Sequence, residues 1–358
     1  MRVTVVGAGA IGGTVGVLLS RAGHDVTLVD RDAAHVAAIN RDGFRLSGVV
    51  ESVERVPAIA PEGLSDLVRE GGPLGLVVLA VKAMDTEAAT ASLLPHLAVD
   101  GAVVSYQNGL LEERIARIVG PERTVGAFVH FGADLVEPGH VVLANRVATH
   151  LGELDGTETP RLHRIAEVLA SATPVVITAN LAGHLWGKLC YAALAYAVST
   201  VDAPVDEVVA EPPAREAIRA AVAEVVDVAR AQGIRLENIP GFEARAFDRR
   251  NPARIAATDA LFDRWAVEGK AAIKRHMGIH RDIKVRKRRT EVDDQVGAVV
   301  ERGRSVGVAT PINALLVELI HQIERGERAH DWSALRELHA AASRPTGADR
   351  TSAGTPGR

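Results

Sequence analysis

Three glycines near the amino end have the spacing of a phosphate-binding turn. They belong to the run Gly7-Ala8-Gly9-Ala10-Ile11-Gly12. In such a run the first glycine permits a tight turn and the second lets a diphosphate approach the backbone. The third lets the next helix pack closely on a strand, and the N–H groups at the start of that helix face the phosphates. This run therefore predicts a dinucleotide-binding site.

The elements around the turn are the ones that such a site needs. Arg2–Val6 is an apolar, β-branched run that predicts a strand directly before the glycines. Residues 11–22 have a helical pattern, and 26–30 predict a second strand that ends on Asp30. A glycine pattern alone is weak evidence, but the strand–turn–helix context makes it specific.

The remaining chain divides into two regions of different pattern. Up to about residue 180, apolar strand-like runs alternate with helical stretches, which predicts a doubly wound parallel sheet. The strand-like runs are 76–81, 102–106, 124–128, 141–143 and 175–178. The sequence Glu137-Pro138-Gly139-His140 predicts a hairpin turn and hence an antiparallel far edge of the sheet. Beyond residue 180 only helical patterns follow, at 181–198, 214–232, 282–303 and in a pair over 311–342.

These patterns predict an α/β Rossmann-type dinucleotide-binding domain over residues 1–179 and an all-helical C-terminal domain over 180–342. Residues 343–358 are rich in Gly, Pro, Ser and Thr, and we expect a disordered tail there. A Rossmann-type domain followed by a helical domain is a common plan of dehydrogenases, in which substrate and nicotinamide meet between the two.

Composition excludes several classes of function. The net charge of −4 gives no general attraction to nucleic acid or to an anionic membrane. Cys190 is the only cysteine, so there is no internal disulfide and no cysteine-built zinc site. No segment is long and apolar enough to span a bilayer, and the first strand begins at residue 2, where a signal peptide would otherwise stand. We expect a cytoplasmic protein.

Further motifs make the interpretation more specific. They are Val81-Lys82-Ala83 and Gln107-Asn108-Gly109 after two predicted strands, Trp186-Gly187-Lys188-Leu189 in the helical region, and Arg289-Thr290-Glu291-Val292-Asp293 about a hundred residues later. With the glycine run, this set and its order resemble the ketopantoate reductases (2-dehydropantoate 2-reductases). The resemblance covers residues 1 to about 330.

The resemblance implies reduction of a 2-keto acid to a 2-hydroxy acid with NADPH. The glycine run, including Ala8, Ala10 and Ile11, would hold the diphosphate. By position, Arg31 matches the arginine that contacts the adenosine 2′-phosphate, and Lys82 matches a second basic residue near that end of the cofactor. Asn108 matches an asparagine near the nicotinamide ribose and the substrate. Lys188 matches the proton donor, and Glu291 matches the acid that binds substrate.

General chemistry supports these implied roles. Hydride arrival at a ketone carbon builds negative charge on the oxygen, which needs a proton and a positive neighbour. Lys188 can supply both, because the residues around it in the sequence are unusually apolar for a surface lysine. Glu291 can orient the ammonium group or accept a hydrogen bond from a substrate hydroxyl.

The chain also departs from the family pattern. The family usually presents asparagines four and eight residues after the lysine, where this chain has Ala192 and Tyr196. A substrate-binding serine usually precedes the Asp-Ile pair, but here Met277-Gly278-Ile279-His280 contains none. A bulkier or less hydroxylated 2-keto acid than ketopantoate is therefore open as the substrate.

Cofactor choice is mixed as well. Asp30 stands where an acidic residue commonly binds the ribose hydroxyls of NAD, whereas Arg31 favours the extra phosphate of NADP. We expect NADP(H), with NAD(H) not excluded.

Two other enzyme or binding classes stay open. A β-hydroxyacid dehydrogenase also pairs a Rossmann domain with a helical lysine, but it expects an asparagine where Ala192 stands. A non-catalytic NADP(H) sensor is the second alternative, and retention of both Lys188 and Glu291 argues against it. A homodimer also stays open as the oligomeric state. No apolar stripe in the sequence identifies the surface through which two copies would pair.

Two patterns have simpler explanations. The basic run Lys284-Val285-Arg286-Lys287-Arg288-Arg289 lacks interleaved aromatics, so we interpret it as a solvated helix face rather than a nucleic-acid site. His276 and His280 have a metal-like spacing, but Gly278 weakens the helix and no third ligand is evident, so we expect no metal.

Overall fold

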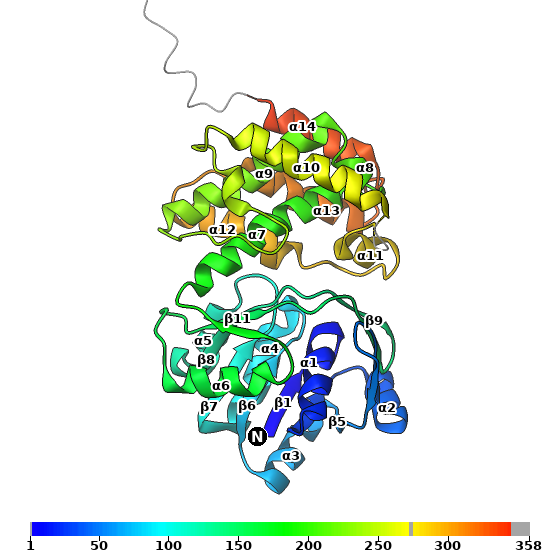
Figure 1. The fold of residues 1–358 in the computed structure, drawn as a ribbon, viewed down its shortest axis with the longest axis vertical. Helices are drawn as coiled ribbons and strands as arrows, with labels where there is room; N and C mark the ends of the chain where they lie inside the picture. The colour runs from blue at the N-terminus through cyan, green and yellow to red at the C-terminus, as the bar shows by residue number, and fades with distance from the viewer. Residues whose placement is uncertain (1, 272–274, 345–358) are drawn as a thin grey trace, which may run out of the picture. The chain divides into compact units, whose positions relative to one another are not determined.

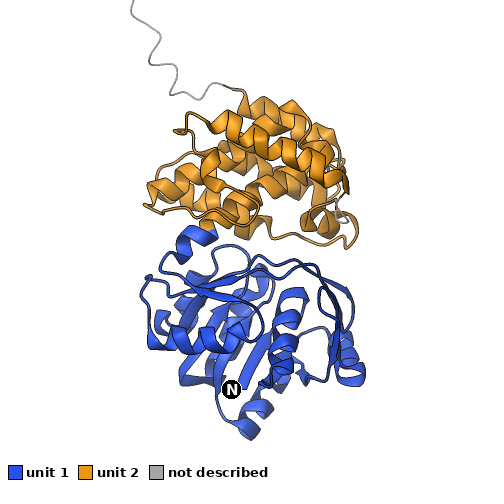
Figure 2. Ribbon diagram, in the orientation of Figure 1, with its two compact units in different colours: residues 1–185 blue, residues 186–358 orange. Residues whose placement is uncertain are grey.

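The computed structural model describes residues 2–271 and 275–344 (Figure 1). The chain divides into two compact units, Met1–Leu185 and Trp186–Arg358 (Figure 2). The division falls inside one helix, α7 (Leu181–Val198). The expected disordered tail lies outside the described residues from position 345 onward.

Unit 1 is built on an eight-stranded sheet in the order β12-β11-β8-β7-β6-β1-β2-β5. Neighbours from β8 to β5 pair in parallel, and β11 and β12 are antiparallel to them. The strands are β1 (Arg2–Val6), β2 (Asp25–Val29), β5 (Ala58–Ile59), β6 (Leu74–Leu79), β7 (Leu97–Ser105), β8 (Thr124–Phe128), β11 (Thr149–Gly152) and β12 (Val175–Ile177). The expected doubly wound parallel sheet is confirmed.

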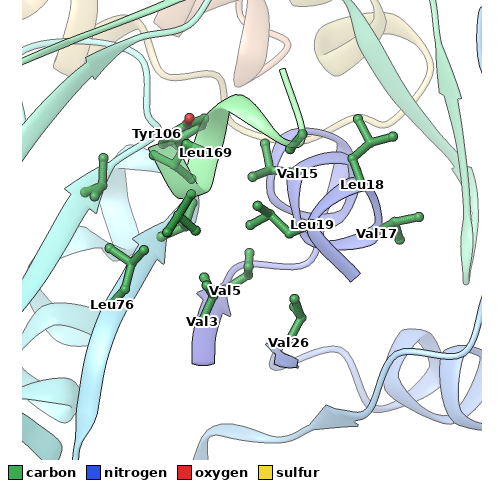
Figure 3. Close-up of a cluster of buried hydrophobic side chains, with 14 of the residues drawn as sticks. Val3, Val5, Val15, Val17, Leu18, Leu19, Val26, Leu76, Tyr106 and Leu169 are labelled. Atoms are coloured by element: carbon green, nitrogen blue, oxygen red, sulfur yellow. The ribbon is translucent and has the colours of Figure 1, made fainter. Parts of the chain in front are cut away.

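Both faces of this sheet are covered, which is why its central strands are mostly apolar and alternate residues do not switch between apolar and polar. Val5 faces a core that includes α1 and α6, whereas Val6 faces a second core with α3, α4 and α5. Figure 3 shows the first core around β1, with Leu19 and Leu169 among its members. The helices are α1 (Ala10–Arg21), α2 (Ala33–Asp42), α3 (Leu64–Gly71), α4 (Thr86–Leu93), α5 (Glu112–Val119) and α6 (Pro160–Ala170).

The predicted hairpin at 137–140 is present but belongs to a different sheet. It joins β9 (Ala133–Glu137) to β10 (His140–Leu143), an antiparallel pair in a small sheet of order β4-β3-β10-β9. The other two strands are β3 (Phe44–Gly48) and β4 (Ser52–Glu54). The far edge of the main sheet is antiparallel to the rest as expected, but β11 and β12 form it.

The regular elements in the described part of unit 2 are helices, apart from an isolated bridge between Ile239 and Phe242. Besides the greater part of α7, its helices are α8 (Val205–Val208), α9 (Pro212–Ala231), α10 (Arg254–Glu268), α11 (Gly278–Lys284), α12 (Ala298–Ser305), α13 (Pro311–Glu324) and α14 (Trp332–Ala342). None of the described helices is long and apolar enough to cross a membrane.

The predicted helix over 282–303 is wrong in its first half. α11 ends at Lys284, and a non-helical segment leads to a short π-helical turn at Asp293–Gly297 before α12. Arg286 and Arg288 both fold back to Asp282, each with a nitrogen 2.9 Å from its Oδ1. Gathering cations around one carboxylate relieves the repulsion that a straight helix of the same residues would carry. The basic run is thus mostly loop, not a helix face.

Candidate active site

The candidate cofactor residues of unit 1 meet at one edge of the sheet. Strands β1, β2, β6 and β7 are parallel, so their carboxyl ends lie side by side. The residues that follow these ends are the glycine run after β1, Asp30 and Arg31 after β2, Lys82 after β6, and Asn108 after β7. Ligands of open α/β sheets bind at this edge.

Each glycine of the run has a separate structural reason. Gly7 has a φ of 91°, and a Cβ there would lie 2.6 Å from the backbone nitrogen of Val81. A Cβ on Gly12 would collide with the carbonyl oxygen of Gly7, which shows how closely α1 packs on the turn. A Cβ on Gly9 would meet nothing within 4 Å. The space at Gly9 and the start of α1 at Ala10 therefore fit a diphosphate group.

Asp30 is tied to the glycine-rich turn. Its Oδ2 accepts a hydrogen bond from the Ala8 N–H at 2.8 Å, and its Oδ1 accepts one from the Asp32 N–H at 2.9 Å. Arg31 beside it is exposed, and one guanidinium nitrogen lies 2.7 Å from Oδ1 of Asp85. Asp30 thus helps to fix the conformation of the glycine-rich turn, while the Arg31 side chain is exposed to solvent.

The two loops after β6 and β7 are joined by Gln107. Its side-chain amide donates to the Val81 carbonyl at 2.9 Å and to the Thr86 hydroxyl at 2.7 Å. This contact fixes the loop that holds half-buried Lys82 against the turn that holds half-buried Asn108. Gly109 follows with a φ of 96°, which explains the Asn-Gly pair as a turn requirement.

One titratable residue at this edge was missed from the sequence. Glu112 is the first residue of α5, and it is buried. Burial raises the pKa of its carboxyl to about 7, although Ser105 and nearby backbone N–H groups favour the charged form. An acidic residue in the first turn of a helix is ordinary in a sequence, so no local signal marks it as buried.

In unit 2, Lys188 lies on a helix that is otherwise almost entirely apolar. It is half-buried, whereas Leu185, Trp186, Leu189 and Cys190 around it are buried. A Cβ on the preceding Gly187 would collide with the carbonyl oxygen of Glu237, so the backbone of another segment passes directly over this turn of α7. Lys188 is the only Lys, Arg, Asp or Glu in α7. A half-buried lysine thus stands among apolar side chains on α7.

The face of α7 that carries Lys188 also carries Tyr196, which lies near Glu291. Lys188, Ala192 and Tyr196 are spaced by four residues, which places them along one side of the helix. Tyr196 is buried, and its pKa is raised well above the usual value by burial first and then by the charge of Glu291. Glu291 is itself only 7% exposed and stands just before the π-helical turn. Tyr196 thus lies near enough to Glu291, within unit 2, for the charge of that carboxylate to act on its hydroxyl.

The segment that lacks the family's serine also approaches α7. The Tyr191 hydroxyl lies 3.6 Å from the sulfur of Met277, next to Gly278 at the start of α11. A Cβ on Gly278 would meet nothing within 4 Å. The predicted residues thus fall into two groups, with the cofactor residues in unit 1 and Lys188 and Glu291 in unit 2.

Comparison with known proteins agrees with this arrangement. The family model described as "Ketopantoate reductase PanE/ApbA" matches residues 3–156, and the one described as "Ketopantoate reductase PanE/ApbA C terminal" matches 180–324. The 2-dehydropantoate 2-reductase of Archaeoglobus fulgidus is 29% identical over 328 residues, covering 91% of this chain and 98% of the relative. That of Halobacterium salinarum is 29% identical over 333 residues, covering 91% and 99%.

Solved structures share the fold. The crystal structure of a PanE/ApbA family ketopantoate reductase from Ralstonia eutropha JMP134 has a TM-score of 0.75 at 27% identity, covering 92% of this chain and 100% of that one. D-mandelate dehydrogenase with NADH and anilino(oxo)acetate has a TM-score of 0.77 at 24% identity, covering 91% and 99%. The order of motifs, the paired units and the matches to both halves lead to one conclusion: the chain belongs to the ketopantoate reductase family.

Proposed function

We propose that this protein reduces a 2-keto acid to a 2-hydroxy acid with a nicotinamide dinucleotide. NADPH is the expected cofactor, and 2-dehydropantoate, after which the curated relatives are named, is the first substrate to test. The observation that carries the proposal is the position of Lys188. It is the one ammonium group of an apolar helix, on the face that carries Tyr196, whose hydroxyl feels the charge of buried Glu291.

The nicotinamide, when bound, supplies the hydride to the carbonyl carbon of the substrate. Lys188 donates a proton to the carbonyl oxygen as negative charge builds on it, and its own positive charge stabilises that oxygen. The apolar neighbours of Lys188 exclude water, which strengthens this interaction. Glu291 orients the ammonium group or accepts from a substrate hydroxyl, and Asn108 donates from its amide to hold substrate and ribose.

The contacts of Asp30 and Arg31 favour NADPH. Both oxygens of Asp30 already accept backbone N–H groups, which leaves this carboxylate less able to bind two ribose hydroxyls. The Arg31 guanidinium is exposed and can pair with a 2′-phosphate in exchange for Asp85. Gly7 to Gly12 hold the diphosphate and Lys82 adds positive charge. NADH remains the comparison cofactor, because a carboxylate oxygen can accept a second hydrogen bond.

The substrate face of α7 favours an acid with fewer hydroxyl groups than ketopantoate. Ala192 offers a methyl group where the family usually has an amide, and Tyr196 is buried within reach of the charge of Glu291. The loss of amide donors weakens selection for substrate hydroxyls. D-mandelate dehydrogenase, the structural neighbour solved with anilino(oxo)acetate, is a reason to test aromatic 2-keto acids as well.

The test is oxidation of NADPH by the purified protein with 2-dehydropantoate and a panel of branched and aromatic 2-keto acids, repeated with NADH. We expect Lys188→Ala to lower kcat by at least about 100-fold while NADPH binding is retained. Lys270→Ala, at an exposed lysine of the same unit, should leave turnover unchanged. Tight NADPH binding with no turnover of any substrate would refute the proposal and favour the sensor alternative. Light scattering on the same samples tests the homodimer.

A further inference from the structure

Three side chains that are far apart in the sequence meet in unit 2. Asp202 follows α7, His280 lies in α11, and His330 lies between α13 and α14. One carboxylate oxygen of Asp202 and one ring nitrogen of each histidine all lie within 4.8 Å of one another. The sequence offered no third ligand near His280, and the fold brings two candidates to it.

His330 is oriented as metal-ligating histidines are. Its Nε2 lies 2.9 Å from the Ser199 carbonyl oxygen, and because a carbonyl can only accept, Nε2 carries the proton. The lone pair is therefore on Nδ1, which is buried and has no hydrogen-bond partner among the described residues. Such a hydrogen bond to a carbonyl fixes the tautomer of a histidine ligand.

His280 and Asp202 form the other side of the cluster. Nε2 of buried His280 lies 2.8 Å from Oδ1 of Asp202, while the Lys284 ammonium lies 2.6 Å from Oδ2. The cluster thus offers one anionic oxygen and two imidazoles, a set that suits zinc and similar ions.

We propose that Asp202, His280 and His330 bind a divalent transition-metal ion of the zinc class. The ion would take the place of the proton between His280 and Asp202 and would use the free lone pair of His330. With bonds of about 2.1 Å, tetrahedral ligands stand about 3.4 Å apart. The 2.8 Å His280–Asp202 contact must therefore open by about half an ångström, which a side-chain movement provides.

The site has a path for an ion and a structural consequence. His330 and Lys284 line an open groove of about 920 Å³, so an ion can approach the cluster from this groove, and access to the buried Nδ1 of His330 requires a side-chain movement. The three ligands come from three segments, and a bound ion would fasten the end of α7 to α11 and to the α13–α14 connection. The Lys284 ammonium beside Asp202 opposes the ion, so we expect weaker binding than at a site without that cation.

The test uses the full chain without a histidine tag, after treatment with a chelator. Titration with Co²⁺ should give one equivalent of binding with visible absorption bands of a tetrahedral ion, and Zn²⁺ should displace it. His330→Gln and Asp202→Asn should each weaken binding at least tenfold. His321→Gln is the control, because His321 is a partly buried histidine of the same unit that pairs with Asp293 instead.

A second readout keeps the test decisive if one variant folds poorly. Zn²⁺ should raise the Tm of the wild-type protein and of His321→Gln, but not of Asp202→Asn, whose substitution keeps the shape of a partly exposed side chain. Binding well below one equivalent, or binding unchanged in both His330→Gln and Asp202→Asn, would overturn the proposal.

Discussion

Replacement of Glu112 by glutamine should stabilise the folded protein at pH values above about 4.5 and should have little effect at lower pH. The Glu112 carboxyl is buried at the start of α5, with its Cγ 3.1 Å from where a Cβ on Gly126 would stand. Burial raises its pKa from 4.5 to about 7. Glutamine has nearly the same shape but carries no charge, so Glu112→Gln removes the ionisation and little else.

The sign and size of the effect follow from this shift. The folded protein holds the Glu112 proton more tightly than the unfolded chain does, so this group favours folding at low pH. That contribution is lost as the pH rises from the unfolded pKa of 4.5 through the folded pKa of about 7. The difference of 2.5 between the folded and unfolded pKa values of Glu112 corresponds to about 3 kcal/mol of unfolding free energy, at 1.36 kcal/mol per pKa unit.

The assay is urea denaturation of the wild-type protein and Glu112→Gln at several pH values between 4.5 and 8. The difference in unfolding free energy should be small at pH 4.5 and should grow to about 3 kcal/mol in favour of the variant at pH 8. Taking the difference cancels the titration of every group that the two proteins share. Glu113→Gln is the control, because Glu113 is exposed. A difference that stays constant over this range would refute the argument from burial.

Two further predictions concern the cofactor turn and the helical unit. Gly9→Ala should keep the Tm of the wild type, because its Cβ meets nothing within 4 Å, yet weaken NADPH binding at least tenfold in a fluorescence titration. Gly75→Ala is the control, because a Cβ there also meets nothing within 4 Å but lies on β6, and it should change neither the Tm nor the affinity for NADPH. An unaltered affinity for NADPH in Gly9→Ala would count against a diphosphate at this turn. Glu224→Ala should lower the unfolding free energy by about 3 kcal/mol in urea denaturation, since this buried carboxylate accepts the first N–H groups of α13 at 2.9 Å. Glu216→Ala on the same helix removes an exposed pair with His339 and should cost at most about 1 kcal/mol; an equal loss in both variants would contradict the capping role.

The sequence predicted the fold well where local pattern and tertiary environment agree. β1, β8 and α7 have the bounds that their apolar patterns indicate, because each is buried on all sides and so is apolar at nearly every position. The exposed helix α10 was missed, since its mixed polar surface gives little periodic signal. The helix expected over 282–303 was wrong because helical spacing cannot show that Arg286 and Arg288 would both turn back to Asp282.

For the site, the sequence indicated residue types but not their partners. Asp30 illustrates the limit, because its position after β2 predicts a cofactor ligand, whereas the fold directs both its oxygens to backbone N–H groups of the turn and of the next loop. Tyr196 illustrates the reverse. From the sequence it is a departure from the family's asparagine, and in the fold it is a buried hydroxyl whose pKa is raised in part by the charge of Glu291. A substitution on one helix is therefore interpretable only with the segment it faces, and that pairing across about a hundred residues arises from tertiary packing rather than from any local pattern.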